Sequence, residues 1–530
     1  MKLMKKLFLL MTVILIITVI AGCGGKGTGT DESTISSTAS GETSDDKTQP
    51  QGSTGKLFDK PVKLTMSIVE HPTYPYNPDA YLRKKILELY NVELEVTAIQ
   101  DGYYDKLNLD MASGEMTDLI YHTDYNQVIK AGHQGALIDF NKYLDKMPNF
   151  MKWAEQNKEY LTYYYSANGE LFMLPNLGYG EAGNRTFWMY RKDLFDKHNL
   201  DVPKTDDEVY EVSKTLKNHY PDSHPLCNRG FLDIFGRIGV QWDTGYPMYY
   251  NNGLKKWTYG PIEDNFKEML TFFNRMYKEG LIPPNSLTLD TKGWQDLIST
   301  NKGFITTDYI ARIDFFNVPM RQENPEFSLQ FMPPFKGGPN GLAQHSTNDT
   351  LLILGLSVAS NSKNIDACIK YLDNMYTEEA INLYTWGAEG ETYEVVNGKK
   401  KYKDLPDGSG YLDVIIKYGF FQRGFFLVMD PYGMISTYSP DTMSALTEAP
   451  KYDHPYRVPF VPFTSAAEEQ KNILETNINT VMQENISKFI LGERSLSEWD
   501  AYKKELEDLG VNDLIKLYND SYDEFKSKLK

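Results

Sequence analysis

Two short motifs have residue types and spacings that could carry out chemistry. Residues 178–183 (GYGEAG) fit the G-x-G-x-x-G pattern, which forms a dinucleotide site only when its glycines open a helix that meets the pyrophosphate. The next residues, 184–191, have the pattern of an extended segment, so we interpret the glycines as a flexible connection between domains. Residues 355–359 (GLSVA) resemble a nucleophile elbow but lack its last glycine, and we expect them to lie along a strand.

Carboxylates are numerous but do not form a recognisable catalytic or metal motif. Asp404, Asp407 and Asp413 have a loosely calcium-like spacing, but they lack the alternation and terminal Glu of an EF-hand, which favours a solvated turn. Among 72 Asp and Glu residues, nothing places two at the separation of about 5–10 Å that glycoside hydrolysis requires. The sequence also has no H-E-x-x-H, Walker A or C-x-x-C motif. An enzymatic function therefore has no motif to support it.

Composition and charge narrow the classes of protein that remain. A chain of 530 residues is long enough for two to four domains of about 100–200 residues each. The net charge of −17 argues against a polyanionic partner such as nucleic acid, which needs a surplus of Lys and Arg. Aromatic residues make up 13% of the chain, and so many amphipathic rings also suit a surface that binds flat, partly apolar groups.

The N-terminus has the pattern of a bacterial lipoprotein signal. Three lysines precede an apolar run, Leu7 to Ile20, which is shorter than the roughly 20 residues of a membrane-spanning helix. The run ends in the lipobox-like sequence Ile20-Ala21-Gly22-Cys23. We expect cleavage before Cys23 and lipidation of its thiol, although an uncleaved anchor helix with a chance cysteine is the alternative. Loss of residues 1–22 would leave 508 residues with a net charge of −20.

A flexible tether is predicted after the lipidation site, ahead of one large exported body. Residues 24–56 are rich in Gly, Ser, Thr and Asp and have almost no large apolar side chains, so they cannot bury enough surface to fold. Only Cys227 and Cys368 remain beyond Cys23. Two separately buried thiols are favoured over a single disulfide bridge.

The body from residue 61 onward alternates strand and helix patterns. Residues 62–69, 92–99 and 118–121 are predicted strands, and 79–90 is an amphipathic helix between the first two. This order predicts an α/β body with a largely parallel sheet. A second such region begins at the strand-like segment 186–191. Further strands are predicted at residues 304–307 and 351–358. A helix is predicted from residue 205 onward, where a T-x-x-E capping box opens it, and further helices are predicted at 266–278, 466–491 and 496–509.

Five separated stretches, in order behind the lipobox, carry a resemblance to a known family. Residues 114–121 (GEMTDLIY) are similar to the family's small-residue turn entering a "PDI" strand, and residues 168–175 (NGELFMLP) are similar to its "NGKLYALP". Residues 189–195 and 202–205 (MYRKDLF, VPKT) are similar to "YRKDLF…VPKTWDE". Near the C-terminus, residues 386–393 and 397–399 (WGAEGETY, NGK) are similar to "GIEGVTYE…DGK", and residues 490–493 with 499–500 are similar to "ITGE…WD.Y". Asp206 stands where Trp is usual. Over most of residues 60–530 the chain thus resembles the extracellular solute-binding lipoproteins of ABC importers, especially the large sugar and oligosaccharide binders.

The resemblance implies a fold of the type II periplasmic-binding-protein class, with two α/β lobes, mixed but mostly parallel sheets and a multi-strand hinge. The expected lobes are 57–180 with 334–384, and 181–333 with 385–530. The chain would cross between them at 178–183, at 331–335 and near 385–390. Such hinges absorb dihedral changes at a few loop positions.

The resemblance also implies the function: capture of a carbohydrate, most plausibly an oligosaccharide, and its delivery to ABC permease subunits without chemistry. The expected protein is a lipid-anchored extracytoplasmic monomer without a cofactor. Some relatives carry a calcium loop, but the corresponding stretch 218–227 has one carboxylate, too few for calcium, so no metal is expected. The alternatives are an exported glycan-processing enzyme and a sensor component that presents ligand to a membrane kinase.

Sugar rings present apolar C–H faces and a rim of hydroxyls, so aromatic platforms and polar side chains in the loops after strands are the candidate ligand contacts. The candidates are Glu70, His71, Tyr74, Tyr76, Tyr121, His122, Asp124, Glu181, Trp242, Tyr246, Asp308, Tyr309, Trp386 and Glu389. Trp242 and Trp386 are the preferred ones. His122 has an equally simple alternative as a partner of nearby backbone, and Trp188 and Arg191 are expected to be structural. The acidic composition disfavours a strongly anionic glycan unless local Arg or Lys side chains override it.

Overall fold

Two separate β-sheets organise the part of the chain that the computed structural model describes, which is residues 56–72, 74–347, 351–406, 409–455 and 458–528. The predicted lipidation site Cys23 and nearly all of the predicted tether lie outside these residues. Within them, no helix combines the length and the apolar character needed to cross a bilayer.

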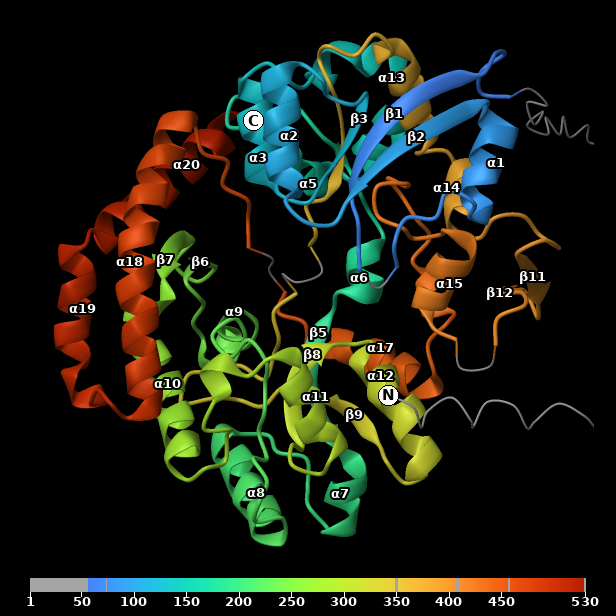
Figure 1. Ribbon diagram of the computed structural model, residues 1–530. Coiled ribbons are helices and arrows are strands. Elements are labelled where there is room, and N and C mark those ends of the chain that lie inside the picture. Colours follow the sequence, from blue (N-terminus) through green and yellow to red (C-terminus); the bar gives the residue numbers. More distant parts are fainter. Residues whose placement is uncertain (1–55, 73, 348–350, 407–408, 456–457, 529–530) are drawn as a thin grey trace, which may run out of the picture. The chain divides into compact units, whose positions relative to one another are not determined.

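The first sheet has five strands in the order β2-β1-β3-β10-β4 (Figure 1). The strands are β1 (Val62–Val69), β2 (Val92–Ile99), β3 (Leu119–His122), β4 (Leu174–Pro175) and β10 (Gly355–Val358). β1 runs parallel to β2 and β3, whereas β10 is antiparallel to β3 and β4. The strands predicted at 62–69, 92–99 and 118–121 are thus parallel as expected, and the later strand β10 makes the sheet mixed.

The second sheet has three strands in the order β8-β5-β9, namely β5 (Thr186–Arg191), β8 (Ile305–Tyr309) and β9 (Leu329–Met332). β5 is antiparallel to both neighbours, so this sheet, unlike the first, has no parallel pair among its three strands. Successive β5 side chains point to opposite faces, so Trp188 and Tyr190 enter one core and Phe187 and Met189 another. Every residue of β5 is buried, which explains its continuous apolar and aromatic pattern.

Helices flank both sheets, and two small antiparallel hairpins complete the body (Figure 1). The hairpins are β6–β7 (Met248–Asn251, Lys256–Tyr259) and β11–β12 (Tyr393–Val396, Lys399–Tyr402). The helices up to residue 238 are α1 (Tyr81–Tyr90), α2 (Tyr103–Ser113), α3 (Tyr125–His133), α4 (Pro148–Gln156), α5 (Lys158–Leu161), α6 (Tyr179–Gly183), α7 (Lys192–Lys197), α8 (Asp206–His219) and α9 (Phe235–Ile238). Those that follow are α10 (Asp264–Lys278), α11 (Thr291–Ser299), α12 (Arg312–Glu323), α13 (Ile365–Asn374), α14 (Glu378–Thr385), α15 (Tyr411–Tyr418), α16 (Tyr432–Ile435), α17 (Pro440–Glu448), α18 (Ser465–Leu491), α19 (Trp499–Asp508) and α20 (Val511–Lys528). Most predicted helices and strands are thus confirmed within a few residues.

The hydrophobic cores divide the body differently from the predicted lobe boundaries. One core combines residues 64–182 with 354–434, and the second combines 188–335 with 478–514. Trp386 and the segment after it therefore pack with the first sheet, which contradicts the crossing predicted near residues 385–390. That crossing lies instead after Met434, the last buried residue of the first core, because the aromatic side chains at 384–434 complete this core before the chain leaves it.

The glycine motif at 178–183 forms the short helix α6 and its N-terminal cap, not a nucleotide loop. Gly178 has φ +107°, and a Cβ there would lie 2.5 Å from the carbonyl oxygen of Met429. Leu177 N donates to Leu427 O at 2.7 Å and Met429 N donates to Leu177 O at 3.1 Å. Gly178 is thus required for close backbone packing, a role that the sequence pattern does not distinguish from flexibility.

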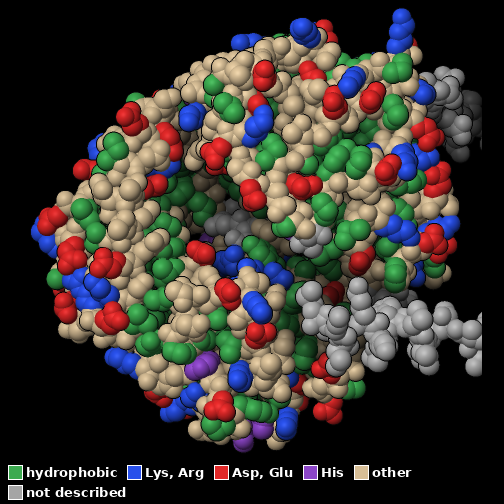
Figure 2. All heavy atoms as spheres, in the orientation of Figure 1, with side chains coloured by type: hydrophobic (Ala, Val, Ile, Leu, Met, Phe, Trp, Pro, Cys, Tyr) green, Lys and Arg blue, Asp and Glu red, His purple; other side chains and the backbone are tan. Residues whose placement is uncertain are grey.

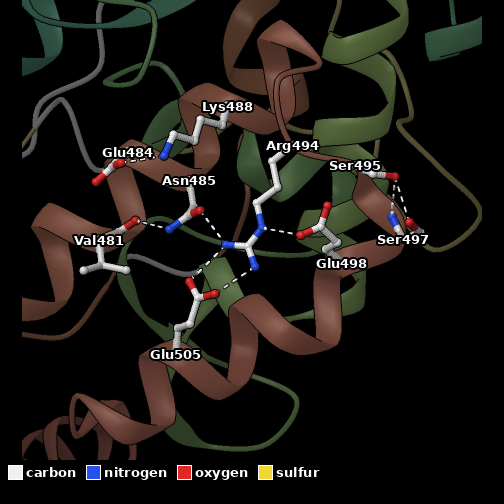
Figure 3. A network of polar contacts seen from close by, with 9 residues as sticks. All are labelled: Val481, Glu484, Asn485, Lys488, Arg494, Ser495, Ser497, Glu498 and Glu505. Atoms are coloured by element: carbon white, nitrogen blue, oxygen red, sulfur yellow. Dashed lines mark hydrogen bonds and ion pairs between the residues drawn. The ribbon is translucent and has the colours of Figure 1, made fainter.

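A polar network around Arg494 joins the helices α18 and α19 (Figure 3). α18 ends at Gly492, in a left-handed conformation (φ +77°), and Arg494 follows in the turn. Its Nη1 donates to Asn485 at 2.5 Å, and its Nη1 and Nη2 each donate to Glu505 at 2.9 Å. The guanidinium therefore fixes the angle between α18 and α19, which pack against α10 and α20.

Cys227 and Cys368 are both free and buried. They belong to different cores, so the prediction of two separate thiols is confirmed. Burial raises the pKa of each thiol to about 12, which keeps both protonated at neutral pH.

Candidate functional site

The loop after β1 and the turn before α6 bring together a group of tyrosines around Arg423. This tyrosine cluster consists of His71, Tyr74, Tyr121, Tyr179, Tyr411 and Arg423. The Arg423 guanidinium carbon lies 4.6 Å from the centre of the Tyr179 ring. Burial, and then Tyr179, raise the pKa of Tyr74 to about 12, while Arg423 opposes this shift. All the members belong to the first sheet and its core or pack against it.

Two of these residues extend the cluster's polar character. The imidazole of His71 stacks on the ring of Tyr74, with ring centres 4.0 Å apart and planes 2° apart. Burial and the charge of Arg423 lower the pKa of His71. The hydroxyl of Tyr121 is buried and has no hydrogen-bond partner among the described residues. Tyr74, Tyr121 and Tyr179 are buried, so the parts of the cluster that a polar ligand could reach are the exposed His71 and the half-buried Tyr411 and Arg423.

A second group, the arginine cluster, lies at the end of β8 and consists of Arg229, Asp308, Tyr309 and Arg312. Asp308 is 1% exposed and accepts two bonds from Arg229, at 2.7 and 3.1 Å. It also accepts from Nε of Arg312 at 3.0 Å, the residue at which α12 begins. Asp308 thus holds two guanidiniums on one carboxylate, with charge-assisted geometry.

The surroundings of the arginine cluster fix both guanidiniums in place. The carboxamide oxygen of Asn228 accepts from Thr307 N at 2.7 Å, which ties the Arg229 loop to β8. The ring of Trp294 lies 5.5 Å from the Arg229 guanidinium carbon and 5.7 Å from that of Arg312. Cation–π contacts of this kind add to the orienting effect of the salt bridges.

The two clusters face each other closely enough to interact electrostatically. Burial raises the pKa of Tyr411, a hydrogen bond with Tyr179 contributes to the rise, and the positive charge of Arg312 lowers it. Figure 2 shows a hollow on this face, with Lys and Arg side chains gathered along its edge near α9 and β8. The charge of Arg312, at the end of the second sheet, thus acts on Tyr411, which packs against the first core.

A separate cavity of about 1420 Å³ is lined by α3, Met248, Trp257, residues 458–463, α18 and α20. Its charged groups include Lys471 and Glu468, which pair at 2.7 Å. Asp124 lines it, but its carboxylate caps α3 by accepting from Asn126 N at 2.9 Å. The cavity has the size of a ligand site, but the polar groups named here bind one another.

Five of the predicted ligand residues meet in the two clusters: His71, Tyr74, Tyr121, Asp308 and Tyr309. Two more lie beside the first sheet: Glu70 accepts from Tyr76 N at 3.1 Å, and the Tyr76 ring stacks on Phe425 at 5.8 Å. The side chain of Glu181 lies outside the described part of the chain.

The remaining predicted residues lie away from the clusters. Trp242 and Trp386, the preferred ligand contacts, are 1% and 0% exposed. Neither indole presents a face to a ligand, so this prediction is wrong for both. Trp242 packs on Phe335 and two other rings, and Nε1 of Trp386 donates to Asp430 at 2.9 Å. Both indoles serve as large apolar rings in the hydrophobic cores.

Tyr246 is half-buried and stacks on Phe266, and Glu389 is exposed. Asp124 caps α3. His122 is 3% exposed. Neither ring nitrogen of His122 has a partner among the described residues. The alternative that this imidazole bonds to nearby backbone is therefore wrong.

Several residues of the clusters escaped the sequence-based prediction: Tyr179, Arg229, Arg312, Tyr411 and Arg423. One signal was available, because Arg312 follows Asp308 at the i, i+4 spacing of a helix-stabilised ion pair. Tyr179 lies inside the glycine motif that we interpreted only as a connection. Arg423 and Tyr411 are far from the other members in sequence, and no local pattern marks them.

Comparisons with known proteins agree with this architecture. A family model described as bacterial extracellular solute-binding protein matches residues 75–381. The chain is 24% identical to the fructooligosaccharide ABC transporter substrate-binding protein FusA of Streptococcus pneumoniae over 96% of both chains. It is 28% identical to lipoprotein LipO of Bacillus subtilis, over 63% of this chain and 69% of LipO.

Among solved structures, the alginate-binding protein AlgQ2 without calcium ion superposes with a TM-score of 0.72 at 22% identity, over 88% of this chain and 99% of AlgQ2. At this identity the likeness concerns the fold. The α/β class and the type II periplasmic-binding-protein-like fold are thereby confirmed.

Proposed function

The chain belongs to the bacterial extracellular solute-binding protein family, and from this premise we propose that it captures an oligosaccharide between two lobes and delivers it to an ABC importer. The lobes we propose follow the two cores, with residues 57–182 and 351–434 in one and 185–345 and 440–528 in the other. Ligand would bind where these lobes meet.

The observation that carries this proposal is that the tyrosine cluster and the arginine cluster pack with different sheets, yet the charge of Arg312 reaches Tyr411. Tyr74 and Tyr179 belong to the first core, whereas Asp308 and Arg312 lie at the end of a strand of the second sheet. A sugar between them would have the half-buried rings of Tyr309 and Tyr411 to stack on, and hydroxyl and guanidinium groups to bond its rim. Movement of one lobe against the other would bury it.

The family and its relatives are binding proteins, and we propose that this chain likewise performs no chemistry on its ligand. Asp308, the buried carboxylate of the site, accepts from Arg229, Arg312 and the backbone N of Tyr309. The oxygens of this carboxylate are occupied by these donors, which suits neither a general acid nor a nucleophile.

We further propose that the mature protein is a lipid-anchored monomer on the outer face of the cell membrane. The lipobox at Cys23 and the polar segment 24–56 would supply anchor and tether. The likeness to LipO, named a lipoprotein, supports this. ABC permease subunits would be the partners.

Isothermal titration calorimetry of residues 24–530 against a panel of oligosaccharides tests the proposed function. We expect dissociation constants in the micromolar range or tighter and recovery of the ligand intact by chromatography. Tyr179→Ala should weaken binding of the best ligand, whereas Tyr250→Ala, in the β6 strand outside the clusters, should not. Absence of binding to every glycan, or cleavage of the bound one, would contradict the proposal.

A further inference from the structure

Guanidinium groups outnumber carboxylates where the two clusters meet. Of the 11 arginines in the chain, Arg229, Arg312 and Arg423 lie in the clusters. The carboxylates described beside them are Asp308 and Asp314, and Asp314 accepts from Ser439 N at 3.1 Å and from its hydroxyl. A chain with a net charge of −17 thus has a locally positive surface at its candidate site.

The two arginines of the arginine cluster retain donors that the protein does not use. A guanidinium has five N–H groups in a planar fork. Arg229 uses Nε and Nη2 on Asp308, and Arg312 uses Nε. Across the described residues, Nη1 of Arg229 and both Nη atoms of Arg312 have no hydrogen-bond acceptor. Their side chains are 26% and 24% exposed, so these donors are available to a ligand.

The geometry is that of a prepared receptor for an anion rather than of a plain salt bridge. Two guanidiniums on one carboxylate leave one positive charge in excess. Trp294 and the fork on Asp308 fix both planes, so little side-chain entropy remains to be lost on binding. When the lobes close, a desolvated charge without a counter-charge is unfavourable, and a neutral sugar could not supply that counter-charge.

We propose that the ligand is an acidic oligosaccharide whose negatively charged groups bind Arg229 and Arg312, with Arg423 opposite them. This inference rests on the proposed function and narrows its ligand class. Carboxylates of uronic acids and sulfate esters both match the planar fork of arginine, so the shared chemistry is an anionic group on a sugar ring. The names of the relatives do not decide the charge, since they include both fructooligosaccharide and alginate.

Calorimetry with trigalacturonate, a sulfated trisaccharide and neutral maltotriose of equal length tests the inference. We expect one of the two acidic sugars to bind at least 10-fold more tightly than the neutral one. Its affinity should fall as salt rises from 50 to 500 mM, because ions screen the contact. Preference for trigalacturonate would identify carboxylate as the bound group, and preference for the sulfated sugar would identify sulfate.

Substitutions locate the effect on the proposed residues. Arg312→Gln should weaken acidic-sugar binding about 10- to 100-fold, the worth of one hydrogen-bonded charge contact, and Arg312→Lys should weaken it less. The matched control is Arg275→Gln on α10, whose guanidinium pairs with Asp207 at the surface. Thermal melting of each variant shows whether it is folded, and if Arg312→Gln is not, Arg312→Lys and the salt series decide.

The outcomes separate the inference from the function on which it rests. Neutral sugars that bind as tightly as acidic ones, without salt dependence, would overturn the acidic ligand and leave oligosaccharide capture intact. Equal affinity of Arg312→Gln and Arg275→Gln for the acidic sugar would overturn the assigned residues. Failure of every glycan, neutral or acidic, to bind would overturn both proposals.

Discussion

The buried His122 predicts that the protein loses stability on mild acidification. The imidazole is 3% exposed, and neither ring nitrogen has a partner among the described residues. Burial lowers its pKa to about 3 from 6.5. Below pH 6.5 the unfolded chain therefore takes up a proton that the folded chain refuses, so stability falls as the pH falls.

The size of this effect follows from the two pKa values. At pH 5 the unfolded imidazole is about 97% protonated and the folded one about 1%, which costs about 2 kcal/mol relative to pH 7.5 at about 1.4 kcal/mol per pH unit. Because the imidazole is almost fully buried, solvent screens this free-energy difference only slightly.

Urea unfolding of the wild type and of His122→Leu at pH 7.5 and pH 5 measures the effect. The loss of unfolding free energy between the two pH values should be about 2 kcal/mol smaller in His122→Leu than in the wild type. Leu137→Ala lines the same small cavity and is the control. It should lower stability at both pH values by about 2–5 kcal/mol without changing the pH dependence. An unchanged pH dependence in His122→Leu would refute the reasoning.

Three further predictions concern Asp308, the helix network and the thiols. Asp308→Asn should lower the free energy of unfolding by about 2–4 kcal/mol because it leaves two guanidiniums without their buried counter-charge; urea titration checks this, and a loss below about 0.5 kcal/mol would contradict it. Arg494→Ala should lower the free energy of unfolding by about 1–2 kcal/mol, which is less than for a buried pair because Glu505 is 45% exposed. In denaturant titrations Glu505→Gln should lower it by a similar amount, and the double variant by little more. Cys227 and Cys368 should resist a thiol reagent at pH 8 in the folded protein, because burial holds their pKa at about 12, and react in urea; rapid reaction without urea would show that one is accessible.

Local patterns predicted most secondary structure because they depend on neighbouring residues. The alternation in residues 92–99 and the cap at Thr205 need no distant partner, and both are found, with Thr205 accepting from Glu208 N at 3.2 Å. Strand direction and lobe boundaries depend on where the chain returns. The antiparallel β10 and the packing of residues 384–434 on the first core were accordingly missed.

The same distinction explains the candidate site. Residues that follow strands, such as Tyr74 and Asp308, could be chosen because strand ends gather at a sheet edge. Trp242 and Trp386 failed because a large aromatic ring serves a core as well as a sugar, and exposure decides between these uses. Arg423 gains its role only through the fold, which brings it to 4.6 Å from Tyr179 across more than 200 residues of sequence.

Net charge and site charge act over different distances, which is why the first did not predict the second. At physiological salt the field of exposed carboxylates is screened within about 8 Å, so the excess of Asp and Glu governs solubility and nonspecific repulsion. Arg229 and Arg312 would act on a ligand in direct contact and partly out of water, where a bidentate bond is stronger and less screened. An acidic exterior around a basic site would therefore repel polyanions that cannot enter and retain acidic sugars that can. Lowering the salt should therefore slow the association of an acidic oligosaccharide with the protein, because the acidic exterior repels it more strongly. It should still raise the equilibrium affinity of this oligosaccharide for the site. Stopped-flow mixing would separate these two effects, and faster association at low salt would show that the basic site rather than the exterior dominates the approach of the ligand.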